Sequence, residues 1–259
     1  MSSRLYKCEN SLIAVLDILG ISSMMRNAQV KDLPNLASNL ESAFSYAQEY
    51  AQKIIATLDK RENKYFSIQR FFKIQVFSDT VVICCNFNKI QKEVSVLDRQ
   101  KIPEYYLLAF GFFLCVKAIA GSLFRDGYPT RGCISVGPII STKNFIIGKP
   151  FIDSITHANN LNVAGIIVLK TAKIVYDCIL KSQYMQKQAP IELHMVPYKN
   201  SRPKKTWCLN FLEYPIDRFL ILNIESFFSK HGKIVTEDAT EKIKNTKKLF
   251  QAFFKKLST

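Results

Sequence analysis

The sequence predicts an α+β fold, in which helices flank a central sheet and a helical extension follows at the C-terminus. Three observations support this prediction. Residues 11–22 contain a run of apolar residues typical of a central strand that is covered on both faces. Further hydrophobic runs of strand length alternate with segments that place apolar residues at helical spacing. Residues 238–257 set apolar residues among lysines, which is the pattern of an amphipathic helix.

The expected elements follow one another from the first strand. Strands are predicted by short runs rich in Val, Ile and Phe, and helices by longer segments with apolar residues three or four positions apart. The expected strands are residues 11–17, 65–78, 80–87, 131–139, 140–148 (as a hairpin with the preceding strand), 165–169, 191–197 and 206–212. The expected helices are residues 30–59, 104–124, 151–161, 171–182 and the segments after 213. Polar composition predicts loops at residues 88–103 and 201–205.

Length and composition restrict the class of protein. A chain of 259 residues can bury a full core, and we expect a domain over residues 1–212 with a basic helical extension over residues 213–259. The most apolar stretch, residues 105–121, is shorter than the roughly 20 residues that span a bilayer. Because it also contains Lys117, it predicts a buried helix and no transmembrane segment. The N-terminal residues lack the apolar region of a signal peptide, so a cytoplasmic location is expected.

The formal net charge of +15 has more than one explanation. It suits a protein that binds nucleic acid or an anionic membrane, or one that steers nucleoside triphosphates into a positive cleft. A lysine-rich composition with a solvated surface explains it equally well. The basic helix at residues 238–257 either packs against the main domain or a dimer partner, or faces nucleic acid or a membrane. The seven cysteines include no C-x-x-C pair and predict reduced core residues, not disulfides or zinc ligands.

Two aspartates stand where a charge needs a partner. Asp17 ends the first apolar run, and Asp79 lies between two β-prone runs, where the flanking Ser78 and Thr80 predict the bend of a hairpin. If the two carboxylates meet, they form a site for Mg²⁺ or Mn²⁺, which prefer hard oxygen ligands and take the remaining ones from water and phosphate. If they do not meet, Asp17 caps a turn and Asp79 is a hairpin residue.

Four motifs in series carry a resemblance to a known family. They are AVLDILGIS, QVFSDTVVI, RGCISVG and GKPFIDSITHANNLNVAGIIV, in this order. Over residues 10–210 the chain resembles the class III nucleotide cyclases, and among these the pyrimidine cyclases of the Pycsar antiphage systems. The resemblance implies a ferredoxin-like core whose central mixed or antiparallel sheet is flanked by helices.

The resemblance also implies site residues. Asp17 and Asp79 match the aspartates that hold two divalent cations, Mg²⁺ or Mn²⁺. Arg131 matches an arginine that supports the active site, with a surface or interface ion pair as the alternative. Substrate contacts are implied for a further set of positions: the backbone of Ile18, Leu19, Gly20 and Ile21 around the triphosphate, Gln75 at the base, and Lys149 at phosphate or in solvent.

Residues 154–159 depart from the family pattern. Ile152 and Thr156 stand where the adenylate cyclases of class III carry an asparagine and an arginine that stabilise the transition state. The pyrimidine cyclases resemble this chain in lacking that pair, but their tyrosine and glutamate within the segment are replaced here as well. Asn159, Asn160 and His157 either contact the substrate or cap or end the helix.

The activity implied by the resemblance is conversion of UTP or CTP into its 3′,5′-cyclic monophosphate and pyrophosphate. The product would act as a second messenger on a separate effector in antiphage defence. The enzyme would be a homodimer with active sites at the subunit interface, and no stable complex with nucleic acid is expected. Two other hypotheses remain open. The altered segment 154–159 favours a catalytically silent nucleotide sensor, and the charge favours a basic nucleic-acid-binding protein.

Overall fold

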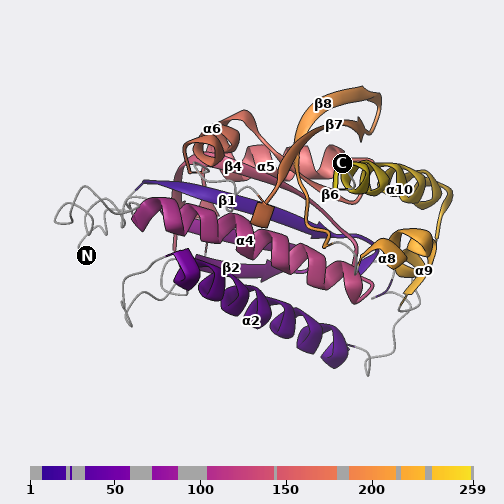
Figure 1. Cartoon of the computed structure of the whole chain (residues 1–259), viewed down its shortest axis with the longest axis horizontal. Coiled ribbons are helices and arrows are strands. Elements are labelled where there is room, and N and C mark those ends of the chain that lie inside the picture. The colour runs from indigo at the N-terminus through magenta and orange to yellow at the C-terminus, as the bar shows by residue number, and fades with distance from the viewer. Residues whose placement is uncertain are drawn as a thin grey trace.

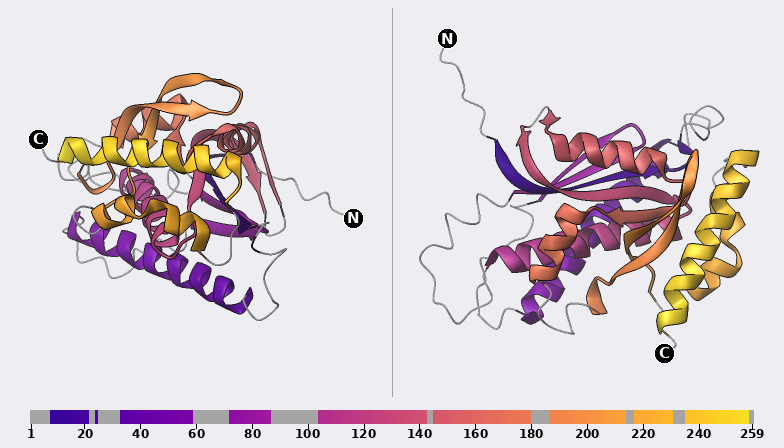
Figure 2. Two further views of the ribbon diagram at one scale, coloured as in Figure 1. Left: turned by 90° about the vertical axis from the view of Figure 1, so that its right-hand side faces the viewer. Right: turned by 90° about the horizontal axis from the view of Figure 1, so that it is seen from above.

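The computed structural model describes residues 8–21, 24, 33–58, 72–86, 104–142, 145–179, 187–213, 217–230 and 235–257. Strands form one central sheet with helices on both of its faces (Figure 1 and Figure 2). The strand order is β2-β3-β1-β4-β6-β8-β7, and β5 pairs with β4 beside this path.

The elements that the structure describes lie close to those expected from the sequence. The strands are β1 (Glu9–Ile18), β2 (Phe72–Phe77), β3 (Thr80–Asn86), β4 (Thr130–Ser141), β5 (Ile146–Ile147), β6 (Gly165–Val168), β7 (Ile191–Tyr198) and β8 (Ser201–Leu209). The helices are α2 (Leu33–Leu58), α4 (Glu104–Arg125), α5 (Lys149–Asn160), α6 (Lys170–Ile179), α8 (Arg218–Leu222), α9 (Ile224–Ser229) and α10 (Glu237–Leu257). The predicted loop at residues 88–103 lies outside the described residues.

The first four strands have ferredoxin-like connectivity. The chain runs from β1 through α2 to the β2–β3 hairpin, and then through α4 to β4. Within the sheet, β1 lies between β3 and β4, and the pairs β1–β3, β1–β4 and β2–β3 are all antiparallel. The helices α2 and α4 lie side by side on one face, and α5 covers the other (Figure 2). The predicted α+β class is confirmed, and β4–β6 makes the sheet mixed because that pair is parallel.

The two faces of β1 enter different parts of the core. Leu12 and Leu16 belong to the large cluster that contains the buried residues of α2 and α4. Ile13 belongs to a smaller cluster against which Phe151 of α5 packs. Since side chains alternate along a strand, Asp17 lies on the same face as Ile13, the one that α5 covers.

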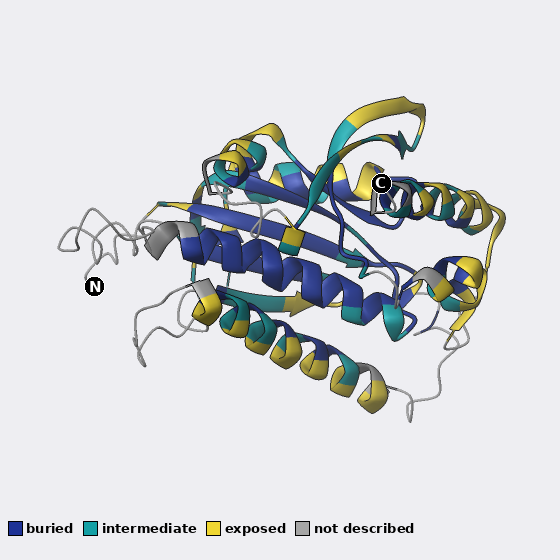
Figure 3. Ribbon diagram, viewed as in Figure 1, coloured by how far each residue is buried: buried dark blue, intermediate teal, exposed yellow. Residues whose placement is uncertain are grey.

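The apolar helix α4 is buried in the core. Its segment Leu107–Arg125 is long and apolar enough to cross a membrane, but 94% of that window is buried within the protein (Figure 3). Lys117 lies inside this window and donates a hydrogen bond of 2.8 Å from Nζ to the carbonyl oxygen of Gln188. The prediction of a buried helix at this position is therefore confirmed.

The C-terminal helix α10 packs onto the same core. Leu249, Phe250 and Phe253 are buried within the main cluster, and the ring centroids of Phe250 and Phe124 of α4 lie 5.1 Å apart. Of the alternatives that the sequence left open for this helix, the structure therefore shows packing against the main domain. The boundary at residue 212 stays a prediction.

The segment 201–205, which was predicted to be a loop, is instead the first half of β8. Lys199 and Asn200 form a tight turn, in which Asn200 adopts a φ of 53°. The register of β7 against β8 shifts between Val196 and Tyr198, and Pro203 lies opposite this irregularity. Because a proline fits a sheet at a bulge or an unpaired edge, Pro203 does not break the strand.

Five of the cysteines that the structure describes are buried and form no disulfide, as expected of reduced core residues: Cys84, Cys85, Cys115, Cys133 and Cys208. Burial raises the pKa of the Cys84 thiol to about 12, so it is protonated at neutral pH. Cys8 is exposed, against the expectation of a core position. The side chain of Cys178 lies outside the described residues.

Candidate active site

An ion pair between neighbouring strands lies at the centre of the candidate site. Asp17 at the end of β1 faces Arg131 of β4 in the sheet register. The Nε of Arg131 donates a hydrogen bond of 2.5 Å to Oδ2 of Asp17. The two side chains are only 15% and 11% exposed, so the charge of Asp17 is compensated mainly by the guanidinium and not by water.

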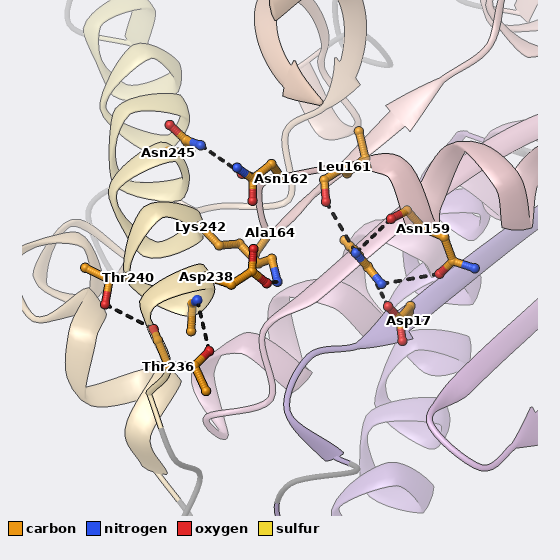
Figure 4. A network of polar contacts seen from close by, with 12 residues as sticks. Asp17, Asn159, Leu161, Asn162, Ala164, Thr236, Asp238, Thr240, Lys242 and Asn245 are labelled. Atoms are coloured by element: carbon orange, nitrogen blue, oxygen red, sulfur yellow. Dashed lines mark hydrogen bonds and ion pairs between the residues drawn. The ribbon is translucent and has the colours of Figure 1, made fainter. Parts of the chain in front are cut away.

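Arg131 is also held by the C-terminal end of α5. Its Nη1 donates to the carbonyl oxygens of Asn159 at 3.1 Å and Leu161 at 3.3 Å, and its Nη2 donates to Oδ1 of Asn159 at 3.3 Å (Figure 4). These bonds use the forked geometry of the guanidinium, which a lysine does not have. The guanidinium is therefore fixed in one orientation between β1 and α5.

The glycine after Arg131 allows this close approach of β4 to β1. A Cβ atom on Gly132 would lie 2.8 Å from the carbonyl oxygen of Val15 and 2.5 Å from Cδ2 of Leu16. The backbone oxygen cannot move aside without disturbing the β1–β4 pairing. Arg131 thus provides the guanidinium, and Gly132 lets β4 lie close to β1.

Asp79 lies at the bend between β2 and β3, as predicted. It follows Ser78, which has a φ of 58°, and the Oγ1 of Thr80 donates to its Oδ1 at 3.4 Å. The carbonyl oxygen of Asp79 accepts a hydrogen bond of 2.8 Å from the N–H of Ile18, the residue after Asp17. The main chains of the two aspartates therefore adjoin, and a shared metal site remains a prediction.

The donor set suits a hard divalent cation that also binds phosphate. Among the described residues, no group of three or more His, Cys, Asp or Glu side chains is placed to hold a metal. Mg²⁺ is commonly held by one or two carboxylates, with water and substrate phosphates as its other ligands. Arg131 occupies Oδ2 of Asp17, so Oδ1 of Asp17 and the carboxylate of Asp79 are the candidate ligands.

The turn after Asp17 uses two of its N–H groups within the protein. The N–H of Ile18 donates to Asp79, and the N–H of Leu19 donates to the carbonyl oxygen of Pro129 at 2.8 Å. These two N–H groups therefore already have partners within the protein, and the contact of the Ile18 and Leu19 backbone with the triphosphate stays a prediction. Gly20 adopts a φ of 83°, a conformation that glycine favours. Gly20 and Ile21 likewise remain predicted backbone contacts.

Gln75 and Lys149 lie in different places relative to the ion pair. Gln75 is a partly buried residue of β2, in the hairpin whose bend holds Asp79. Lys149 is exposed at the opposite end of α5 from Asn159 and pairs with Asp153 at 2.6 Å. Ten residues of helix separate Lys149 from Asn159, a distance of about 15 Å. Within one chain, Lys149 is therefore not brought to Asp17, and its two alternatives, phosphate contact or solvation, stay predictions.

The altered segment of α5 has roles that the sequence did not indicate. Ser154 is buried, and its Oγ lies 2.8 Å from Oγ of Ser135 in β4, which fixes the helix to the sheet. Ile152 is 61% exposed. Asn159 bonds Arg131 with both its main chain and its side chain. Sequence analysis considered Asn159 as a substrate contact or a helix end, and no local pattern pointed to Arg131.

The sequence matches no protein-family model and no curated protein. Solved structures with a similar course of the chain include the catalytic core of a rhodopsin-guanylyl cyclase with converted specificity in complex with ATPαS. It shares 11% identity at a TM-score of 0.44, over 78% of this chain and 96% of that one. Another is an adenylate/guanylate cyclase/hydrolase from Silicibacter pomeroyi, with 16% identity, a TM-score of 0.39 and coverage of 78% and 97%. Both TM-scores lie below 0.5, so they carry no weight for the function proposed below.

Proposed function

We propose that this protein is a nucleotide cyclase that converts UTP or CTP into the 3′,5′-cyclic monophosphate and pyrophosphate. The observation that carries the proposal is the junction of Asp17 and Asp79, whose strand end and hairpin bend are joined by the 2.8 Å bond from Ile18 N–H to Asp79. The ferredoxin-like connectivity around this junction and the four sequence motifs support the same proposal.

Each group at the site has a task in this reaction. The 3′-oxygen forms a bond to the α-phosphorus, the bond from that phosphorus to the pyrophosphate oxygen breaks, and the 3′-hydroxyl proton passes to solvent. Asp17 and Asp79 would hold the divalent cations, and these would supply positive charge that lowers the pKa of the 3′-hydroxyl and neutralises phosphate charge. Arg131 is held rigidly by Asn159 and supplies a preorganised positive charge for the negative charge that develops during transfer.

The choice of base and the assembly are part of the same proposal. The amide of Gln75 has both a donor and an acceptor and is assigned to the edge of a pyrimidine. We assign β2 to a homodimer interface, because Val76 and Phe77 beside the Asp79 bend are 41% and 47% exposed although apolar. The enzyme is further proposed to work in the cytoplasm, where its product binds a separate effector during antiphage defence.

A nucleotide sensor without catalysis is the second candidate. The ion pair between Asp17 and Arg131 favours it, because a carboxylate whose Oδ2 is held at 2.5 Å has less capacity left for a cation. A sensor of this kind binds nucleoside triphosphate without turning it over. Turnover therefore separates the two candidates.

The test is a turnover assay with purified protein, Mn²⁺ or Mg²⁺, and each of ATP, GTP, CTP and UTP in a separate reaction. Products are identified by mass spectrometry for wild type, Asp79→Asn and the matched control Asp153→Asn. The control removes a carboxylate charge from α5, away from the Asp79 bend. We expect cyclic UMP or cyclic CMP from wild type and control, and a loss of roughly 100-fold or more in Asp79→Asn. Equal turnover by both variants would exclude Asp79 from the site, and nucleotide binding without product would favour the sensor.

A further inference from the structure

A short connector joins the candidate site to the C-terminal half of the chain. Residues 161–164 lead from α5 to β6. The carbonyl oxygen of Leu161 accepts a bond from Arg131 at 3.3 Å. The N–H of Asn162 donates to the carbonyl oxygen of Pro197 near the end of β7 at 3.0 Å, and the N–H of Lys199 donates to Asn160 at 2.8 Å. The turn between β7 and β8 is therefore fixed beside Arg131.

The helix α10 is fixed to the same connector. The Nδ2 of Asn245 donates to the carbonyl oxygen of Asn162 at 3.0 Å (Figure 4), and the N–H of Ala164 donates to Oγ1 of Thr246 at 2.8 Å. Thr246 in turn donates to the carbonyl oxygen of Lys242, one helical turn earlier, at 2.7 Å. The position of Lys242 relative to the connector is thereby set.

The side chain of Lys242 is turned into the protein. It is only 12% exposed, whereas its partner Asp238 is 69% exposed, and Nζ lies 3.4 Å from Oδ2 of that carboxylate. A lysine on a helix next to solvent normally keeps its ammonium in water. Most of the Lys242 side chain is therefore buried, on a helix that is bonded to the connector beside Arg131.

Lys199 lies within reach of the charges of Arg131, Lys242, Asp238 and Asp17. Burial lowers the pKa of Lys199, and the positive charges of Arg131 and Lys242 lower it further, while Asp238 and Asp17 raise it. The five groups carry three positive and two negative charges. Crowding of like charges in a partly buried place costs free energy unless an anion compensates it. Cations held by Asp17 and Asp79 would increase the positive excess.

We propose that Lys242 of α10 binds the terminal phosphates of the substrate together with Arg131, so that the C-terminal helix forms part of the substrate site. The identity of the ligand as a nucleoside triphosphate rests on the proposed function. A lysine ammonium is a compact donor that suits phosphate oxygens. In the absence of substrate the carboxylate of Asp238 pairs with the ammonium of Lys242. The phosphates replace that carboxylate when they bind.

The experiment measures binding of inorganic tripolyphosphate to the full chain by isothermal titration calorimetry, without divalent cations or nucleotide. The variants are Lys242→Gln, Asp238→Asn and Lys248→Gln, the last of which removes the same charge from an exposed position on the same helix. We expect Lys242→Gln to weaken binding roughly tenfold, as for loss of one charge-assisted hydrogen bond. Asp238→Asn frees the ammonium and should tighten binding several-fold, and Lys248→Gln should leave the affinity within about twofold.

Two results would overturn the proposal. One is an absence of tripolyphosphate binding by the wild type, and the other is an equal effect of Lys242→Gln and Lys248→Gln, because net charge alone would then explain both. If Lys242→Gln fails to fold by circular dichroism, Asp238→Asn decides by itself, and unchanged affinity in that variant contradicts the proposal. A specific loss of binding in Lys242→Gln, combined with no cyclic product in the turnover assay, would support the phosphate site and reject the cyclase.

Discussion

Replacing Arg131 by alanine tests whether the ion pair with Asp17 exists as described. The substitution removes a guanidinium that bonds one carboxylate and three further oxygens of Asn159 and Leu161. A hydrogen bond to a charged group is worth about 1.5–3 kcal/mol, and removal of one partner of a buried pair costs about 3–5 kcal/mol. Since the pair retains 11% and 15% exposure, we expect the lower end of that range, about 3 kcal/mol.

Thermal unfolding followed by circular dichroism measures this loss. For a chain of this length about 1 kcal/mol lowers the midpoint by roughly 2–4 °C, so Arg131→Ala should unfold about 6–12 °C below wild type. Arg131→Lys keeps the positive charge but not the forked guanidinium, so its unfolding midpoint should lie between those of wild type and Arg131→Ala. The control is Arg202→Ala at an exposed position of β8, which should leave stability within about 0.5 kcal/mol.

A midpoint for Arg131→Ala that matches the one for Arg202→Ala would refute the ion pair. A double-mutant cycle gives a second check. Asp17→Asn and Arg131→Ala remove the same interaction, so the double variant should lose less stability than the sum of the two single losses. Strict additivity would mean that the two side chains do not interact.

Three further predictions follow from particular residues. Gly132→Ala should destabilise the protein strongly in urea unfolding, because its Cβ would lie 2.8 Å from the backbone oxygen of Val15; a loss below about 0.5 kcal/mol would mean that β4 does not approach β1 this closely. Burial lowers the pKa of Lys117 below its ordinary value of 10.5, so the unfolded chain binds the proton more readily and stability should rise with pH between the folded and the unfolded pKa. Urea unfolding from pH 7.5 upward should show this rise in wild type and lose it in Lys117→Met, and equal slopes would contradict it. Phe77→Asp should shift a homodimer to monomers in analytical ultracentrifugation, whereas Phe219→Asp, at a 68% exposed position on α8, should not; two dimeric variants would place the interface elsewhere.

The order of the elements was predictable because its signals are local. The apolar run before Asp17, the helical spacing of α2 and the position of Asp79 between two β-prone runs all depend on neighbouring residues. Residues 201–205 were missed for a physical reason. Whether such a polar stretch pairs as a strand depends on the turn that Asn200 makes and on the partner strand β7, and neither is encoded within the stretch itself.

Contacts across the site were less accessible from the sequence. Asp17 and Arg131 were both recognised as site residues, but their pairing depends on the register of strands whose residues are 114 positions apart. Lys149 was assigned to phosphate or to solvent, and its separation from Asp17 within one chain depends on the direction of α5. Lys242 lies on a helix interpreted as an extension, so its approach to the connector depends on packing that no periodicity reveals.

The most direct test of the cyclase proposal is a competition experiment. Wild-type protein is given ATP, GTP, CTP and UTP together at equal concentration with Mn²⁺, and each cyclic and linear product is quantified by mass spectrometry. We predict that a 3′,5′-cyclic pyrimidine monophosphate accumulates with an equal amount of pyrophosphate and that cyclic purine nucleotides stay at background. Accumulation of cyclic AMP or cyclic GMP would contradict the pyrimidine assignment, and the absence of every cyclic product would contradict the cyclase itself.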